Sequence, residues 1–204
     1  MKFPITGLYA ITQTEQKFPD RIISEVAAAI KGGAVMVQYR DKNPLNALFL
    51  GRELVKICHQ HHIPLLINDD IELALQVGAD GVHLGREDGA VAQARELLGS
   101  DAIIGVSCYN SVEQALTAQA QGATYAAFGR FFPSTSKPLA QPANIETLRQ
   151  ARLALTIPIV AIGGILPENG KQLLAAGADL LAVIGGIFNL QPELSARSYR
   201  TLFT

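Results

Sequence analysis

The 204-residue chain has few charged residues and almost no cysteine. Charged residues make up 17% of it, and Lys plus Arg (17) nearly balance Asp plus Glu (18), so the formal net charge is −1. A chain without an overall positive field is not expected to bind nucleic acid or an anionic membrane, and any anion site must be local. Cys58 and Cys108 lie far apart with no C-x-x-C partner. This argues against a disulfide framework or a zinc site and predicts two free thiols in a reducing compartment.

Long apolar runs are also absent. No stretch approaches the roughly 20 consecutive apolar residues that a membrane-spanning helix requires. The N-terminal MKFPITGLYAIT has no apolar region followed by a small-residue cleavage site. Yet hydrophobic residues make up 49% of the sequence, enough for one large core. We therefore expect a cytoplasmic protein that folds as a single domain over residues 1–204.

A short pattern recurs along the chain: KGGAVMVQYR (31–40), QVGADGVHLG (76–85), AQGATYAAFG (120–129) and AAGADLLAVIG (175–185). Each copy has Gly-Ala after a helix-like stretch and then a short apolar run. Glycine commonly ends a helix because it accepts the left-handed conformation. A continuous apolar run is typical of a parallel strand that is covered on both faces. Four more apolar segments are predicted strands: 8–12, 64–68, 103–107 and 158–163.

Helical patterns separate the predicted strands, at 20–30, 45–59, 71–77, 111–119, 144–154 and 169–175. Alternating strands and helices give parallel strands joined by right-handed crossovers. Eight such units predict an α/β fold, a single compact (β/α)₈ TIM barrel. An open doubly wound sheet is the alternative, but no Gly-x-Gly-x-x-Gly follows the first strand.

The second predicted strand ends in polar residues. In VQYRDK (37–42), Gln38, Arg40 and Lys42 stand at alternate positions, so their side chains project from one face of the strand. Catalytic groups of a TIM barrel lie at the C-terminal ends of the strands and in the loops that follow. We therefore expect these three residues to face an active site. The alternative is an ion pair between Arg40 and Asp69 at the rim.

Other strand ends carry groups suited to phosphate. Gly163-Gly164 and Gly185-Gly186 follow strands seven and eight, where this fold commonly binds phosphate through backbone N–H groups. Arg40, Lys42 and Lys137 add cations that suit a second, more highly charged phosphate group. Gly163-Gly164 also suits a crowded barrel corner, so a purely structural role of this pair stays open.

Two carboxylates complete the predicted site. Asp69 and Asp88 follow adjacent strands, and Mg²⁺ is usually held by one or two carboxylates together with substrate phosphates. The set predicts two phosphorylated substrates, one of them a diphosphate bound with Mg²⁺. Structural alternatives exist here too: Asp88 suits the N-cap of a helix over 89–98, and Ser134 and Ser136 suit a turn.

Histidine and cysteine are weaker candidates. The cluster of His59, His61 and His62 lies where a helix ends, a position that the helix dipole favours for imidazole. His83 lies inside a strand and is predicted to be a hydrogen-bonded core residue. Cys108 has no histidine close behind it, so we do not expect a thiolate nucleophile.

Eight segments resemble, in order, the thiamine-phosphate synthase family: GLYAIT, VQYRDK, INDD, GADGVHLGREDG, IIGVSCYNSVEQA, YAAFGRFFPSTSKP, IPIVAIGGI and GADLLAVIGGI. The resemblance runs from about Gly7 to Ile187. It implies a transferase that joins 4-amino-2-methyl-5-(diphosphooxymethyl)pyrimidine to 4-methyl-5-(2-phosphoethyl)thiazole and releases thiamine phosphate and pyrophosphate. It also implies Mg²⁺ as cofactor and these two small molecules as partners, while a homodimer stays open.

The resemblance assigns roles to individual residues. The diphosphate would be held by Gln38, Arg40, Asn68 and Lys137, with Lys42 nearby. Mg²⁺ would be held by Asp69 and Asp88. The thiazole phosphate site would be lined by Gly164, Ile184 and Gly185. Ser134 and Ser136 match the loop after strand six, and Ser107 would orient the pyrimidine and the leaving group. The catalytic candidates are Arg40, Ser107 and Lys137.

The implied reaction needs little acid–base chemistry. The pyrimidine amino group stabilises a cation at the exocyclic methylene, so ionisation precedes attack by the thiazole nitrogen, and the protein mainly neutralises the departing pyrophosphate. Two alternatives remain. A thiazole tautomerase of the same superfamily tends to lack the metal aspartates and to use a histidine near Ser107, whereas this chain keeps the aspartates and lacks that histidine. A non-catalytic thiamine-phosphate-binding paralogue would bind without turnover.

Several positions depart from the family pattern. Gly185 stands where many relatives have Ser, which implies the loss of one hydroxyl contact to the thiazole phosphate. Asp70 stands where Arg is common, which implies added negative charge beside the metal. Ser134 and Ser136 replace threonines, and Tyr109 replaces a frequent histidine.

Overall fold

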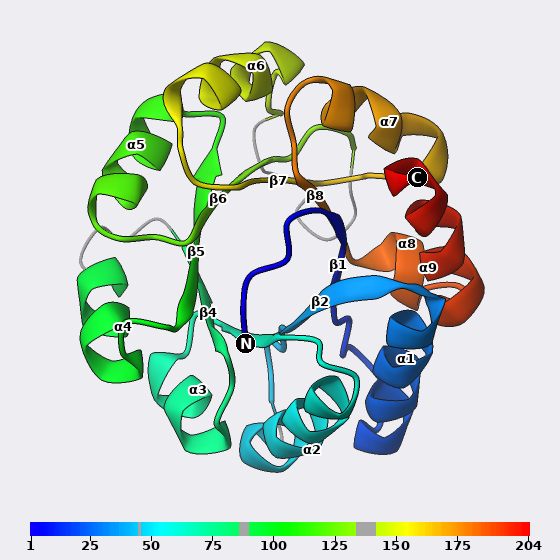
Figure 1. Ribbon diagram of the computed structural model, residues 1–204. Helices are drawn as coiled ribbons and strands as arrows, with labels where there is room; N and C mark the ends of the chain where they lie inside the picture. Colours follow the sequence, from blue (N-terminus) through cyan, green and yellow to red (C-terminus); the bar gives the residue numbers. More distant parts are fainter. Residues whose placement is uncertain (45, 86–89, 134–141) are drawn as a thin grey trace.

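The computed structural model of the chain describes residues 1–44, 46–85, 90–133 and 142–204. It shows a closed barrel of eight parallel strands in chain order, and β8 pairs with β1 (Figure 1). The strands are β1 Gly7–Ile11, β2 Ala34–Tyr39, β3 Leu65–Asn68, β4 Gly81–Leu84, β5 Ile103–Tyr109, β6 Tyr125–Gly129, β7 Ile159–Ile162 and β8 Leu180–Val183. The predicted TIM barrel is confirmed.

Helices surround this barrel (Figure 1). They are α1 Pro19–Gly32, α2 Ala47–Gln60, α3 Ile71–Val77, α4 Ala90–Leu98, α5 Val112–Ala120, α6 Ile145–Ala154, α7 Pro167–Ala175, α8 Gly185–Phe188 and α9 Pro192–Arg200, followed by the 3₁₀ turn Thr201–Phe203. Among the helices of the described segments, none is long and apolar enough to cross a lipid bilayer. The four-residue α8 and the C-terminal α9 were not predicted from the sequence.

The four Gly-Ala junctions end helices as predicted. Gly33, Gly78, Gly122 and Gly177 each follow a helix, and all four have positive φ, between 71° and 113°. This left-handed conformation is costly for residues that carry a Cβ. The repeated pattern therefore marks the four points at which a helix turns back toward an even-numbered strand.

Two apolar layers form the core, and strand alternation separates them. In β1, Tyr9 and Ile11 point into the barrel and join an interior cluster, whereas Leu8 and Ala10 pack outward against the helices. Because both faces are buried, the strands read as continuous apolar runs.

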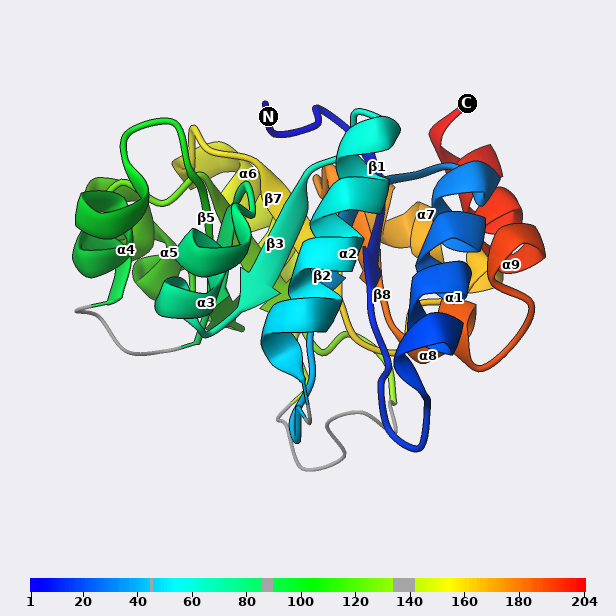
Figure 2. The same ribbon diagram turned by 90° about the horizontal axis from the view of Figure 1, so that it is seen from below.

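The two ends of the barrel differ. The segment before β1 crosses the end at which the strands begin (Figure 1), and Phe3 there stacks on Tyr125 with ring centroids 5.0 Å apart. Figure 2 shows both chain termini at this end and the loops that follow the strands at the opposite end. A site inside the barrel is therefore reached from the C-terminal end of the strands.

Candidate functional site

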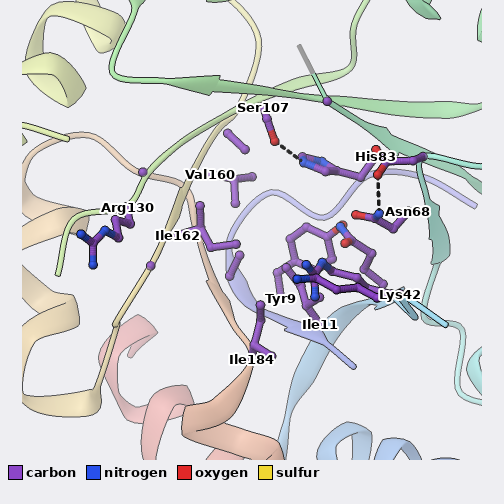
Figure 3. Close-up of a pocket in the computed structure, with 18 of the residues that line it drawn as sticks. Tyr9, Ile11, Lys42, Asn68, His83, Ser107, Arg130, Val160, Ile162 and Ile184 are labelled. Atoms are coloured by element: carbon purple, nitrogen blue, oxygen red, sulfur yellow. Dashed lines mark hydrogen bonds between the residues drawn. The ribbon is translucent and has the colours of Figure 1, made fainter. Parts of the chain in front are cut away.

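A cavity of about 820 Å³ lies at the C-terminal end of the barrel, and residues from all eight strands or the loops after them line it. In Figure 3, Lys42 and Asn68 lie on one side, and Ile162 and Arg130 lie on the other. Predicted residues in the lining are Gln38, Arg40, Lys42, Asn68, Asp69, Ser107 and Ile184. The volume is in the range of pockets that bind small molecules.

The polar end of β2 faces this cavity, as its alternation predicted. Gln38 is almost completely buried, Arg40 is half-buried and Lys42 is exposed. Thr12, at the end of the neighbouring strand, fixes the backbone beneath Arg40: its Oγ1 accepts from the Arg40 N–H (2.9 Å) and donates to the Arg40 carbonyl oxygen (3.0 Å).

The two cations that follow β2, Arg40 and Lys42, do not form the ion pair that the sequence offered as an alternative. Arg40 and Lys42 appear in none of the ion pairs formed within the described part of the chain, so Arg40 does not pair with Asp69. Both side chains line the cavity. The cavity wall therefore carries positive charge that a bound anion can neutralise.

Asp69 enters the cavity on a strained backbone. It follows β3 with φ 62°, in the left-handed region that a residue with a Cβ seldom adopts. Its N–H donates to the His83 carbonyl (2.8 Å), and its Oδ2 accepts from Asn68 Nδ2 (2.7 Å). Strain of this kind costs on the order of 1–3 kcal/mol and is concentrated at functional sites. The arrangement supports a site role for Asp69 rather than a purely local one.

The neighbouring Asp70 has a different task. Its Oδ1 accepts from the Leu73 N–H (2.8 Å) and caps the N-terminus of α3. Asp70 is not among the residues that line the cavity. The Asp that stands here in place of the Arg common in the family therefore caps a helix, and this cap holds its carboxylate.

Ser107 and His83 form a hydrogen-bonded pair at the base of the cavity. His83 Nε2 lies 2.9 Å from Ser107 Oγ (Figure 3). Its Nδ1 lies 2.8 Å from the Tyr125 hydroxyl. His83 is thus hydrogen-bonded, as expected, but it also lines the cavity, which was not predicted. Like Asp69, Tyr109 at the end of β5 lines the cavity and has a positive φ, 53°.

The glycines after β7 are packed against another loop. Gly163 lines the cavity with φ 104°, and a Cβ there would lie 2.3 Å from Arg130 Cβ. At Gly164, with φ 62°, a Cβ would lie 2.4 Å from the Pro133 carbonyl oxygen. The crowded-corner interpretation therefore holds for both, and it does not exclude phosphate binding by Gly163.

The start of α8 lies beside the cavity. Ile184 is part of the lining, but Gly164 and Gly185 are not. A Cβ at Gly185 would approach Asn189 Nδ2 to 2.9 Å, so the Asn189 amide occupies space that a serine side chain would need.

Some predicted residues cannot be placed, and others lie elsewhere. Asp88, Ser134, Ser136 and Lys137 lie outside the described residues. In the part of the chain that is described, no three His, Cys, Asp or Glu side chains gather as a metal-binding group. Of the two predicted magnesium ligands, Asp69 is therefore the one that the structure describes. Its carboxylate lines the cavity and has the oxygen chemistry that Mg²⁺ requires.

The other histidines and the two cysteines do not line the cavity. His59 Nε2 lies 2.9 Å from Asp80 Oδ2, and Asp80 also accepts from the N–H of Leu65 at the start of β3, away from the cavity. Cys58 and Cys108 are free and buried, and burial raises the pKa of both thiols to about 12. Neither is a thiolate at neutral pH, in agreement with the prediction that Cys108 is not a thiolate nucleophile.

Comparisons with known proteins show the family of this chain. A model of the thiamine monophosphate synthase family matches residues 8–187. Thiamine-phosphate synthase from Nitrosococcus oceani is 48% identical over 206 residues, covering 100% of this chain and 95% of the relative. The chain belongs to the thiamine monophosphate synthase family. It is accordingly an enzyme, a transferase.

Further relatives of this family show the same extent of similarity. Thiamine-phosphate synthase from Methylococcus capsulatus is 50% identical over 190 residues, which are 92% of this chain and 84% of the relative. The solved structure of thiamine phosphate pyrophosphorylase from Pyrococcus furiosus has a TM-score of 0.86 and 33% identity, and covers 97% of this chain and 95% of that one. The thiamine monophosphate synthase fold therefore extends over nearly the whole chain.

Several lining residues of this thiamine monophosphate synthase family member were missed from the sequence: Tyr9, Asp41, Asn43, His83, Tyr109 and Arg130. Arg130 follows β6 directly, so its strand-end position was a usable signal. Tyr9 and His83 gave no such signal, because in a strand buried on both faces the sequence does not reveal which alternate residues point inward.

Proposed function

We propose that this enzyme joins 4-amino-2-methyl-5-(diphosphooxymethyl)pyrimidine to 4-methyl-5-(2-phosphoethyl)thiazole, giving thiamine phosphate and pyrophosphate. The observation that carries the proposal is the pair of cavity cations, Arg40 and Lys42, which form no ion pair within the described segments and lie on a wall shared with Asp69. The high identity to proteins named thiamine-phosphate synthase supports the same substrates.

The bond changes are those of a dissociative displacement. The bond between the exocyclic methylene carbon and the diphosphate oxygen breaks, and its electron pair leaves with pyrophosphate. The aminopyrimidine delocalises the positive charge until the thiazole nitrogen donates its lone pair to form the new C–N bond. No proton has to be removed. This agrees with a cavity in which His83 is held by hydrogen bonds at both ring nitrogens.

The protein's part is to bind and stabilise the leaving group. We assign Gln38, Arg40, Lys42, Asn68 and Lys137 to the diphosphate, where donors of fixed position stabilise developing negative charge. Asp69 and Asp88 are the residues that would hold Mg²⁺, which when bound supplies further positive charge at the diphosphate. The apolar wall around Val160 and Ile162 excludes water from the reactive cation.

The second substrate is assigned to the opposite side of the cavity. Gly164, Ile184 and Gly185, at the ends of β7 and β8, would receive the thiazole phosphate through backbone N–H groups. Ser134 and Ser136 would border it from the loop after β6. Ser107 would orient the pyrimidine between the two phosphate sites.

A direct assay tests the proposal. Purified protein is given both substrates and MgCl₂, and we expect pyrophosphate and thiamine phosphate in equal amounts. Arg40→Ala should lower kcat on the order of 10²-fold or more, because it removes an electrostatic stabiliser. The matched control Arg52→Ala removes an exposed cation of α2 and should leave kcat unchanged. Pyrophosphate at background level would refute the function, and conversion of the thiazole phosphate alone would indicate the tautomerase.

A further inference from the structure

A continuous chain of hydrogen bonds crosses the barrel interior at the base of the cavity, and all of its members except Tyr125 line the cavity. It joins five strands: Gln38 Nε2 to the Tyr9 hydroxyl (2.7 Å), Tyr9 to the Tyr125 hydroxyl (3.0 Å), Tyr125 to His83 Nδ1 (2.8 Å), and His83 Nε2 to Ser107 Oγ (2.9 Å). Its two ends are residues assigned above to the diphosphate and to the pyrimidine. The chain therefore links two parts of the cavity through Tyr9, Tyr125 and His83.

Tyr125 is the central member and does not itself line the cavity. Its side chain is completely buried and is held by aromatic contacts on three sides. Phe3 stacks on it at 5.0 Å, His83 stacks at 5.7 Å, and Tyr9 meets it edge-on at 6.1 Å between ring centroids. A ring held in this way has a fixed hydroxyl position, so its hydrogen bonds are also fixed.

The direction of the chain follows from its first member. An amide nitrogen can only donate, so Gln38 Nε2 donates to the Tyr9 oxygen. Tyr9 is 1% exposed, and its other hydrogen-bond partner among the described residues is Tyr125. Tyr9 therefore donates its single hydrogen to Tyr125. Burial raises the pKa of both phenols, so each hydroxyl keeps its hydrogen at neutral pH.

The remaining steps follow from counting hydrogens. Because Tyr125 accepts from Tyr9, it donates its own hydrogen to His83 Nδ1. The neutral imidazole then carries its hydrogen on Nε2 and donates it to Ser107 Oγ. The Ser107 hydrogen is left for the cavity. If the chain ran in the opposite direction, Ser107 would donate to His83 and offer only lone pairs to a substrate.

We propose that Tyr125 is a positioning residue that fixes His83 as the Nε2–H tautomer and thereby makes Ser107 a hydrogen-bond donor toward the cavity. The inference rests on the proposed function only for the identity of the substrate that accepts the hydrogen bond from Ser107. Both candidate recipients, a pyrimidine ring nitrogen and a diphosphate oxygen, are acceptors without hydrogens. A donor at Ser107 suits either of them, and an acceptor would repel them.

The decisive measurement needs no substrate. NMR of protein labelled with isotopic nitrogen in histidine distinguishes the two tautomers of His83, and a His83→Asn variant identifies its signals. We expect the Nε2–H form in the wild type and a mixture of both tautomers in Tyr125→Phe. The control Tyr199→Phe removes a buried hydroxyl that donates to the Ile165 carbonyl, and it should leave the tautomer unchanged. A wild-type Nδ1–H form, or an unchanged tautomer in Tyr125→Phe, overturns the proposal.

A second variant keeps the proposal testable if Tyr125→Phe does not fold. Gln38→Glu replaces the donating amide with a carboxylate that only accepts, so Tyr9 should donate to it and the whole chain should reverse. The expected result is the Nδ1–H tautomer of His83. An Nε2–H tautomer in folded Gln38→Glu with an ionised carboxylate would overturn the directed chain.

Kinetics separate this proposal from the proposed function. In the synthase assay, Tyr125→Phe should lower kcat on the order of tenfold, with an unchanged KM for the thiazole phosphate, because one hydrogen bond to the reacting group is lost. If the wild type makes no thiamine phosphate but the tautomers behave as expected, the proposed function fails and the positioning role stands. If the wild type is active and Tyr125→Phe retains full kcat, the positioning role fails alone.

Discussion

Thr12 shows how a single buried side chain places a cavity cation. Its hydroxyl both accepts from and donates to the backbone of Arg40, at 2.9 Å and 3.0 Å, and its exposed fraction is 1%. The two hydrogen bonds join the ends of β1 and β2 where the chain leaves the barrel. The orientation of Arg40 thus depends on a residue that does not line the cavity.

Replacement of Thr12 tests this dependence. Thr12→Val keeps the shape but removes both hydrogen bonds, so the partly buried N–H and carbonyl groups of Arg40 lose this partner. We expect a loss of about 1–3 kcal/mol in the free energy of unfolding, measured in urea, and a higher KM for the pyrimidine diphosphate. Thr12→Ser keeps the hydroxyl and is the control. A Thr12→Val protein with the stability and KM of Thr12→Ser would show that the hydroxyl does not position Arg40.

Asp69 and Asp70 are adjacent carboxylates with different expected roles. Asn tolerates both the left-handed backbone of Asp69 and the helix cap at Asp70, so each Asp→Asn change removes charge without breaking the local structure. Asp69→Asn should weaken Mg²⁺ binding in the presence of pyrophosphate by about tenfold or more, as titration calorimetry would measure, because the proposed direct ligand loses its charge. Asp70→Asn should bind as the wild type does. Equal affinities in all three proteins would remove Asp69 from the metal site.

At the scale of elements, the repeated Gly-Ala junctions do more than end helices. In three of the four, the residue after Gly-Ala clamps the first or second residue of a neighbouring strand with its side chain and its backbone N–H. The side-chain bonds are Asp80 to Leu65 N (2.9 Å), Thr124 to Ile104 N (3.0 Å) and Asp179 to Ile159 N (2.7 Å). The backbone bonds return from the same three residues to the carbonyl groups of the same partners. The clamps fix the register of β3, β5 and β7.

The clamp at Asp80 should depend on pH. Burial opposes ionisation of Asp80, but hydrogen bonds from the Met1 amino group, the Leu65 N–H and His59 outweigh it and hold the pKa of Asp80 below its usual value. A carboxylate with a lowered folded pKa stabilises the protein above its unfolded pKa of about 4, and this contribution is lost as the pH falls below that value.

The Asp80→Asn variant tests the sign of this effect. At pH 7 it should lower the free energy of unfolding by about 1–3 kcal/mol, since a buried acceptor of several hydrogen bonds loses its charge. The difference from the wild type should shrink as the pH falls from about 5 toward 3. Asp101→Asn, at an exposed position, should match the wild type throughout. A difference that grows on acidification would contradict the lowered pKa.

The sequence predicted the elements better than the contacts between them. All eight strands and the four glycine stops follow from local chemistry, because apolar runs and left-handed glycines are properties of short segments. The clamps at Asp80 and Asp179 were not predictable, since they depend on which strands pair. The glycine-rich α8 lacks the residues that favour a helix and was missed for that reason.

The candidate site was predictable only in part. Arg40, Lys42 and Asp69 were found because the C-terminal ends of parallel strands meet at one end of a barrel. The placement of Tyr9 and His83 depends on which alternate residues of a buried strand point inward, and apolar neighbours on both faces conceal this. The roles of all these residues in binding stay predictions.

At the scale of the whole molecule, one column of side chains joins the closed end of the barrel to the cavity. Phe3 covers the end where the strands begin and stacks on Tyr125, and Tyr125 contacts His83, which reaches Ser107 at the cavity. The N-terminal segment is therefore continuous with the interior packing rather than a loose extension over the barrel (Figure 1). A change at Phe3 acts on the barrel from the end opposite to the substrate.

Two substitutions in the N-terminal segment test whether this segment supports the packing of the barrel interior. Phe3→Ala removes the stacked ring from the half-buried position beneath Tyr125 and should lower the free energy of unfolding by about 1–3 kcal/mol, below the cost of a fully buried Phe. It should also lower kcat, because Tyr125 loses one of the rings that hold it. Ile5→Ala, in the same segment but 87% exposed, should change neither quantity. If urea unfolding and kcat are the same for both variants, the N-terminal segment does not support the interior column, and the position of Tyr125 is set by the strands alone.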